Sequence, residues 1–310
     1  MTADLLGPHL TAVGEVLISL QAPAGADLAN TDTLEVRIAG AEANFAAAFI
    51  RAGGTAALCS AVGRDPFGDQ VLHRLAGVGM DVAGVRRDQD RPTGVMLNQR
   101  SAGERQVFYY RAGSAASGLT VDQILTESVG SVAISGVTFA IAAGLRDGVD
   151  DLLAGLRAAD RDLVLDVNLR PKLGNVPAVI AAIGKAARQA SMVFVGLDEA
   201  GPVFGVDQPA ALARLIAGDG GAEVVVTDGA NGSWVAGQHL PAIPVTVVDP
   251  VGAGDAFAGT YCGLRAFGES PIVAGRVAAA VAARVVSTAG DLDGLPSAAD
   301  VQSLLAEYRL

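Results

Sequence analysis

One short stretch, Asp249–Gly259, combines small residues and an acid in an order that suits chemistry on an anion. Its letters, DPVGAGDAFAG, place Gly252, Ala253 and Gly254 directly before Asp255. Small residues let a backbone approach an anion closely, and the N–H groups of a helix's first turn supply donors and positive dipole. An aspartate there can accept a proton from a hydroxyl held against the same anion hole. The stretch therefore predicts phosphoryl transfer to an alcohol.

Asp255 also has a purely structural interpretation. An acid in the first turn of a helix offsets the helix dipole, which contributes about 0.3–1 kcal/mol. That role does not require three tiny residues in front of the acid. The sequence therefore favours Asp255 as general base and the backbone of Gly252, Ala253 and Gly254 as anion hole.

The elements that must position this stretch follow an α/β pattern. Apolar runs alternate with helical stretches, which predicts a parallel sheet with helices on both faces. Strands are expected at 10–20, 55–62, 132–135, 163–167, 192–195, 224–227 and, leading into the stretch, 245–248. Helices are expected at about 40–53, 69–75, 147–159, 177–189, 208–217, 255–266, 271–288 and 297–308.

Two segments, about 17–38 and 91–112, have a different pattern from the rest of the chain. In the second segment, short β-like runs at 93–97 and 106–111 flank a polar turn at 101–104, which is hairpin patterning and not βαβ patterning. We interpret this hairpin, together with the segment 17–38, as a small β lid that projects from the main sheet. The chain shows no repeats, charge blocks or low-complexity linkers, so we expect residues 1–310 to form a single domain.

Composition excludes several classes of function. The 310 residues carry a net charge of −11, which argues against a nucleic-acid surface, and an anionic substrate would have to be met by local arginines and backbone N–H groups. The three histidines lack metal-ligand spacing, and Cys59 and Cys262 lie in apolar settings that suit packing. There is no targeting segment and no run of transmembrane length, so we expect a cytoplasmic protein with no membrane partner.

Three motifs, in order along the chain, resemble those of the ribokinase-like (PfkB) sugar kinases. Asp249–Gly259 resembles the signature near their C-terminus, Gly40–Asn44 (GAEAN) their sugar-binding element, and Gly63–Gly68 (GRDPFG) their G-x-D-x-x-G turn. The similarity covers essentially the whole chain. It implies a three-layer α/β sandwich with a mostly parallel central sheet and a β lid. The implied reaction transfers the γ-phosphate of ATP to a sugar hydroxyl, with Mg²⁺ present and Asp255 as base.

Within that family, the segments 107–111 (VFYYR) and 166–170 (DVNLR) look most like 2-keto-3-deoxygluconate kinases. Arg111 and Arg170 could bind a sugar-acid carboxylate with fork geometry, and Tyr109 offers a hydroxyl from the lid. The purely structural interpretations are lid packing for the tyrosine and surface ion pairs for the arginines. A neutral-sugar kinase of the ribokinase or fructokinase type, or a nucleoside kinase, has less need of two such arginines.

The resemblance also implies a wider set of site residues. Beyond those already named, the substrate is expected to contact Gly40, Asn44 and Asn168, and Glu199 is expected near Mg²⁺ through water. The nucleotide is expected at Thr227, Gly229, Gly232 and Gly254, although an Asn-Gly turn such as 231–232 also forms without any ligand. A monovalent cation fits the resemblance, and an exposed edge of the lid could pair with its twin in a homodimer.

Four positions depart from the family pattern: Gly196 stands where the family has Asn or Ser, Asp228 where a basic or neutral residue would suit a phosphate, Met96 where some relatives have Tyr, and Gly174 where Trp is frequent. Because of Gly196 and Asp228, the sequence is also compatible with a non-catalytic sugar-binding protein on the same fold.

A nicotinamide-dependent enzyme and a P-loop kinase do not fit the sequence. Phe257 occupies the third glycine of a dinucleotide fingerprint, and Gly184-Lys185 is followed by Ala186, which breaks a P-loop.

Overall fold

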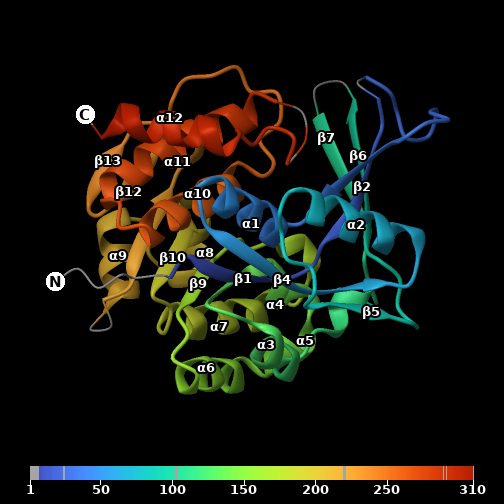
Figure 1. The fold of residues 1–310 in the computed structure, drawn as a ribbon, viewed down its shortest axis with the longest axis horizontal. Helices are drawn as coiled ribbons and strands as arrows, with labels where there is room; N and C mark the ends of the chain where they lie inside the picture. The colour runs from blue at the N-terminus through green and yellow to red at the C-terminus, as the bar shows by residue number, and fades with distance from the viewer. Residues whose placement is uncertain are drawn as a thin grey trace.

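The main sheet forms the middle layer of the molecule (Figure 1). The computed structural model describes residues 7–23, 25–101, 104–218, 221–288, 290 and 292–309. Within them the sheet has nine strands in the order β13-β12-β11-β10-β9-β8-β1-β4-β5. The strands are β1 (His9–Val13), β4 (Thr55–Gly63), β5 (Val85–Asp88), β8 (Ser131–Ser135), β9 (Leu163–Asp166), β10 (Met192–Gly196), β11 (Glu223–Thr227), β12 (Ser233–Val235) and β13 (Gln238–Leu240). Neighbours pair in parallel except β11–β12 and β12–β13, which are antiparallel.

Alternate residues of each strand supply two separate cores, because side chains in a strand point to opposite faces. Met192 and Phe194 of β10 belong to one core, and Val193 and Val195 belong to the other. Helices cover both faces, so the predicted three-layer α/β sandwich is confirmed.

The first core packs under α1 (Ala41–Arg51), α2 (Pro66–Gly77), α10 (Ala253–Ala266), α11 (Pro271–Val286) and α12 (Ala298–Tyr308). The second packs under α3 (Val121–Glu127), α4 (Gly136–Ile141), α5 (Ala143–Asp147), α6 (Val149–Ala158), α7 (Val176–Ala187), α8 (Leu197–Phe204) and α9 (Pro209–Ala217). Short 3₁₀ turns lie at η1 (Ala115–Gly118), η2 (Pro171–Leu173) and η3 (Gly229–Asn231). No helix in the described ranges is long and apolar enough to cross a membrane.

A second, four-stranded sheet stands apart from the main one, as the sequence predicted. Its strands are β2 (Leu17–Gln21), β3 (Glu35–Ala39), β6 (Val95–Ser101) and β7 (Glu104–Tyr110), in the order β3-β2-β6-β7. We call this sheet the lid. Figure 1 shows β6 and β7 extending away from the body of the molecule. The side of the lid that faces the body carries a small apolar cluster of Leu17, Ala39 and Met96, against which Val107 packs.

The prediction of one strand over 10–20 is wrong. The chain leaves the main sheet at Gly14 and enters the lid at Leu17, so β1 and β2 belong to different sheets. Gly14 faces the buried carboxyl of Glu42, and a Cβ on Gly14 would lie 2.2 Å from its Cδ. The mostly apolar composition of 10–20 resembles that of one strand, but this close approach is a tertiary contact that a local pattern does not reveal.

The predicted strand over 245–248 is also wrong. In the part of the chain that the structure describes, this β-branched run belongs to neither sheet, and Val247 is 63% exposed. The N–H groups of Val248 and Asp249 instead both donate to the carbonyl of Val286 at the end of α11, at 2.7 and 3.0 Å. The main sheet ends with the β12–β13 hairpin, which the sequence pattern missed together with β5, α3, α4, α5 and α8.

Candidate active site

A cavity of about 550 Å³ opens between the carboxyl ends of the main-sheet strands and the lid. This is the edge at which an open parallel sheet binds its ligands. Most of the predicted site residues line the cavity, namely Gly40, Asn44, Tyr109, Arg111, Asn168, Arg170, Glu199, Thr227, Gly252, Gly254 and Asp255. Ala253, Gly229 and Gly232 do not line it.

The N-terminus of α10 enters this cavity. Gly252 is the N-cap of α10 and has φ 76°, a left-handed conformation that favours glycine. Gly254 is the second residue of α10, and a Cβ added to it would meet no neighbouring atom within 4 Å. Packing within the protein therefore does not require a glycine at position 254. The open space beside a helix N-terminus is what a bound anion needs.

Asp255, in the first turn of α10, contacts two buried amides from other elements. Asn44 of α1 donates from Nδ2 to Oδ2 of Asp255 at 2.9 Å, and Asn168, just after β9, reaches Oδ1 at 3.5 Å. Asn168 has φ 34°, in the left-handed region that asparagine tolerates better than most residues. Three segments far apart in sequence therefore hold this carboxylate at the cavity wall.

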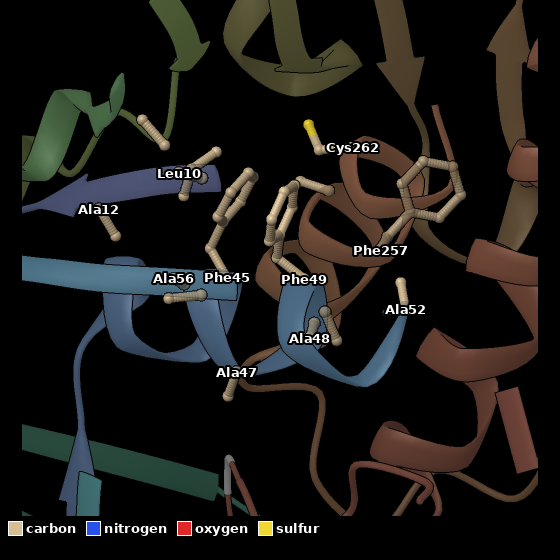
Figure 2. Close-up of a cluster of buried hydrophobic side chains, with 14 of the residues drawn as sticks. Leu10, Ala12, Phe45, Ala47, Ala48, Phe49, Ala52, Ala56, Phe257 and Cys262 are labelled. Carbon is tan, nitrogen blue, oxygen red and sulfur yellow. The ribbon is translucent and has the colours of Figure 1, made fainter. Parts of the chain in front are cut away.

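The contact between Asn44 and Asp255 depends on close packing of α1 against α10. A Cβ on Gly259 would lie 2.1 Å from the carbonyl oxygen of Phe45, and one on Gly263 would lie 2.6 Å from Cβ of Ala52. Figure 2 shows the α1 side chains of this core beside those of α10, including Phe257 and Cys262. The last glycine of DPVGAGDAFAG therefore serves helix packing, and the earlier ones face the cavity.

Asp166 is a cavity residue that the sequence analysis did not select. It ends β9, and its Oδ2 accepts a hydrogen bond from Nδ2 of Asn168 at 3.0 Å. Burial, together with the negative charges of Asp255 and Glu199, raises the pKa of Asp166 well above its ordinary value. The signal that could have found it is its position at the carboxyl end of a buried strand, two residues before Asn168.

Glu199 and Arg170 lie together on the cavity wall. The carboxylate of Glu199 accepts N–H bonds from Leu169 at 2.7 Å and Gly196 at 3.1 Å, and Arg170 Nη1 lies 3.6 Å from it. Burial raises the pKa of Glu199, although these N–H groups and the Arg170 charge oppose the change. Gly196 is the N-cap of α8, and Glu199 binds its N–H in the absence of a capping side chain.

The lid contributes Tyr109 and Arg111. The Arg111 guanidinium lies over the Tyr109 ring, 5.5 Å from its centroid. It also forms an ion pair with Glu15, whose side chain is 1% exposed, against 11% for that of Arg111. The charge of Arg111 is therefore largely matched inside the protein. Two of the residues that depart from the family pattern have local structural roles. Met96 packs in the apolar cluster of the lid, and Gly174, with φ 84°, ends η2.

The predicted nucleotide residues occupy the end of β11 and the turn after it. Thr227 ends β11 at the cavity, and Gly229 and Gly232 follow with φ 49° and 101°. A Cβ on Gly232 would lie 2.1 Å from the carbonyl oxygen of Leu240, so packing explains this glycine. The carboxylate of Asp228 accepts a bond from the Asn231 amide at 3.0 Å, which gives this unexpected acid a structural partner.

The Gly63–Gly68 turn lies outside the cavity and has a structural role. Asp65 is the N-cap of α2 and accepts bonds from Gly68 N–H at 2.8 Å and from Thr93 N–H and hydroxyl, each at 2.8 Å. A Cβ on Gly68 would lie 2.3 Å from the carbonyl oxygen of Gly63. The turn therefore fastens the start of α2 to the segment that enters lid strand β6.

Comparison with known proteins agrees with this geometry. The model of the pfkB family of carbohydrate kinases matches residues 8–298. A 2-dehydro-3-deoxygluconokinase from Thermoproteus tenax is 34% identical, with 96% of this chain and 94% of that protein covered. One from Bacillus subtilis is 32% identical, with 96% and 95% covered. An Escherichia coli protein crystallised with ATP and Mg²⁺ has the same fold, with a TM-score of 0.86 at 24% identity and coverage of 96% and 99%.

The chain belongs to the pfkB family of carbohydrate kinases. It is an enzyme that transfers a phosphoryl group to a sugar hydroxyl, as the sequence predicted. Structural relatives with bound ATP, one of them also with Mg²⁺, support the use of both by this family.

Proposed function

We propose that this kinase phosphorylates a 2-keto-3-deoxy sugar acid, with 2-keto-3-deoxygluconate as the first candidate. The observation that carries the proposal is the convergence of Asp255, the N-terminus of α10 and Arg170 on one cavity. Relatives over nearly the whole chain that are named for this substrate support the choice.

Asp255 is the proposed general base. In the reaction, the sugar hydroxyl oxygen attacks the γ-phosphorus of ATP, the bond to the bridging oxygen breaks, ADP leaves, and Asp255 takes the hydroxyl proton. Asn44 and Asn168 orient the carboxylate through their amide groups. The backbone of Gly252, Ala253 and Gly254 stabilises the charge on the transferred group, because the helix N-terminus presents N–H groups and positive dipole to it.

Arg170 is the proposed arm for the sugar-acid carboxylate. Its side chain is 54% exposed and its nearest carboxylate oxygen, on Glu199, is 3.6 Å away, so it can turn toward a ligand at little cost. Lys172 also lines the cavity and adds positive charge on that side. We propose that Arg111 and Tyr109 bind the other end of the sugar, with Gly40 and Asn44 beneath it.

Thr227, Gly229, Gly232 and Gly254 form the proposed nucleotide site. Among the described residues, no group of three or more His, Cys, Asp or Glu side chains could hold a metal by itself. This suits Mg²⁺, which kinases hold with one or two carboxylates, water and the phosphates of the substrate. Glu199 fits an indirect role, because its oxygens keep lone pairs for water beyond the two N–H bonds that they accept. When bound, Mg²⁺ neutralises charge on the phosphates.

The test is a coupled ADP-release assay with 2-keto-3-deoxygluconate, fructose, ribose and nucleosides, with and without K⁺. The proposal expects the highest kcat/KM for the sugar acid. A neutral-sugar kinase is the second candidate, which the ion pair of Arg111 with Glu15 favours. Higher kcat/KM for fructose or ribose would select that candidate, and sugar binding without ADP release for any compound would contradict a kinase role. A change with K⁺ would support the predicted monovalent cation.

We also propose a homodimer through the lid in a cytoplasmic enzyme. Strand β7 is an edge strand of the lid, and Phe108 and Tyr110 on it are 45% and 66% exposed. Unpaired edges with apolar side chains are natural pairing surfaces. Light scattering of the wild type and of Phe108→Lys tests the dimer, and the substitution should dissociate it. Cell fractionation tests the cytoplasmic location.

A further inference from the structure

The chain crosses between the main body and the lid four times within the described residues, and all four crossings meet at one residue, Glu15. Glu15 lies in the first crossing, and Gly40 in the second would place a Cβ 2.6 Å from the carbonyl oxygen of Glu15. Gly94 in the third would place a Cβ 2.5 Å from Oε1 of Glu15. Arg111 and Ser114 in the fourth bind the Glu15 carboxylate directly.

Each oxygen of this buried carboxylate has its own partner. Oε1 of Glu15 accepts the hydroxyl of Ser114, and Oε2 forms the ion pair with Nη2 of Arg111. Burial raises the pKa of Glu15, and the Arg111 charge and the Ser114 hydroxyl oppose that change. Arg111 and Glu15 both line the cavity, and Arg111 also lies over the ring of Tyr109. The carboxylate thus contacts Arg111 directly and reaches Tyr109 only through Arg111, and the proposed function assigns both of these residues to the sugar.

We propose that Glu15 is the positioning residue of the sugar site. Its carboxylate fixes Arg111 at the place where the four crossings meet, which we call the hinge, so that the guanidinium contacts the sugar in one orientation. A guanidinium held by a buried carboxylate loses less freedom when a ligand binds, and preorganisation of this kind raises affinity. The inference rests on the proposed role of Arg111 toward the sugar. It adds a residue whose proposed effect on the sugar passes through Arg111.

A purely structural role for Glu15 predicts different behaviour. A residue that only stabilises the hinge would lower stability when changed, and its effect would be independent of Arg111. A positioning residue acts through Arg111, so its effect vanishes once Arg111 is gone. A double-mutant cycle separates the two cases.

The experiment compares wild type, Glu15→Gln, Arg111→Ala and the double variant, using the sugar that gives the highest kcat/KM with the wild type. KM for sugar and for ATP are measured, and sugar affinity is measured calorimetrically without turnover. Glu15→Gln keeps the shape of the side chain and a hydrogen-bond acceptor for Ser114. We expect each single variant to raise the sugar KM roughly tenfold, the double variant to raise it no further, and the ATP KM to stay within about twofold.

Glu223→Gln is the matched control. Glu223 is likewise a largely buried carboxylate that forms an ion pair with an arginine, Arg265, but neither residue lines the cavity. It should leave the sugar KM within about twofold, since only a carboxylate bound to Arg111 acts on the sugar. A sugar KM for Glu15→Gln within twofold of wild type, or multiplied effects in the double variant, would overturn the inference. An unchanged sugar KM in Arg111→Ala would instead refute the role of Arg111 in the proposed function.

Discussion

Gly259→Ala tests whether the signature stretch contains a packing residue as well as catalytic ones. The added Cβ would lie 2.1 Å from the Phe45 carbonyl oxygen and 2.9 Å from Cβ of Ala48. Ordinary contacts between such atoms exceed 3 Å, so α1 and α10 must separate by about 1 Å. Overpacking of this kind costs about 1–3 kcal/mol, and the upper part of that range applies because the obstacle is backbone.

A gain of up to about 1 kcal/mol in helix propensity offsets part of that cost, which leaves a net loss of about 2 kcal/mol. Urea unfolding measures this loss directly, and Tm should fall by roughly 3 °C. The same separation moves Asn44 away from Asp255, so kcat should fall ~10–100-fold.

The matched control for Gly259→Ala is Gly184→Ala. Gly184 lies in the middle of α7, and the nearest atom to a new Cβ is Arg188 Nη1 at 3.8 Å. This substitution should stabilise the protein by up to about 1 kcal/mol, because alanine is the better helix former and meets no obstacle. If Gly259→Ala proved as stable as Gly184→Ala, the packing role of Gly259 would be refuted.

Two further predictions concern single side chains. Arg170→Ala should raise the KM for the sugar acid roughly tenfold and should change the kinetics with a neutral sugar little. Tenfold is at the lower end of the effects of charged hydrogen bonds, because the Arg170 side chain is half exposed. Equal losses for both sugars would refute the role of Arg170 in binding the carboxylate. Asp65→Ala should cost about 1–2 kcal/mol at pH 7, because it removes the N-cap of α2 and both bonds to Thr93. Burial alone would raise the pKa of Asp65, but the bonds from Thr93 and Gly68 outweigh it and lower that pKa. The stability from Asp65 is therefore present above about pH 4 and lost as pH falls through the lowered pKa, so urea unfolding should show the two proteins converging in acid, and a constant difference would refute this.

Local signals in the sequence were sufficient for much of the fold. The alternation of apolar runs and helices predicted the parallel sheet, and the hairpin spacing of 91–112 predicted the two lid strands there. The small residues before Asp255 predicted a helix N-terminus, and Gly252 is the N-cap of that helix. Each of these features depends on residues that are close together in the chain.

The remainder depends on contacts between distant segments. Gly14 lies against the buried carboxyl of Glu42, and nothing in the run 10–20 indicates that neighbour. Val245–Val248 has strand-like composition, but its backbone pairs with a helix end. Asp166 and Glu15 look like ordinary strand and loop acids until the fold brings them to the cavity.

The proposed role of Asp255 is tested most directly by Asp255→Asn, measured with saturating ATP and the preferred sugar. The substitution keeps the size of the side chain and removes the proton acceptor, so kcat should fall ~10²–10⁴-fold. Sugar affinity measured by calorimetry should stay within a few-fold, because Asn44 can still donate to the amide oxygen at position 255. Turnover within tenfold of wild type would contradict the assignment of Asp255 as general base.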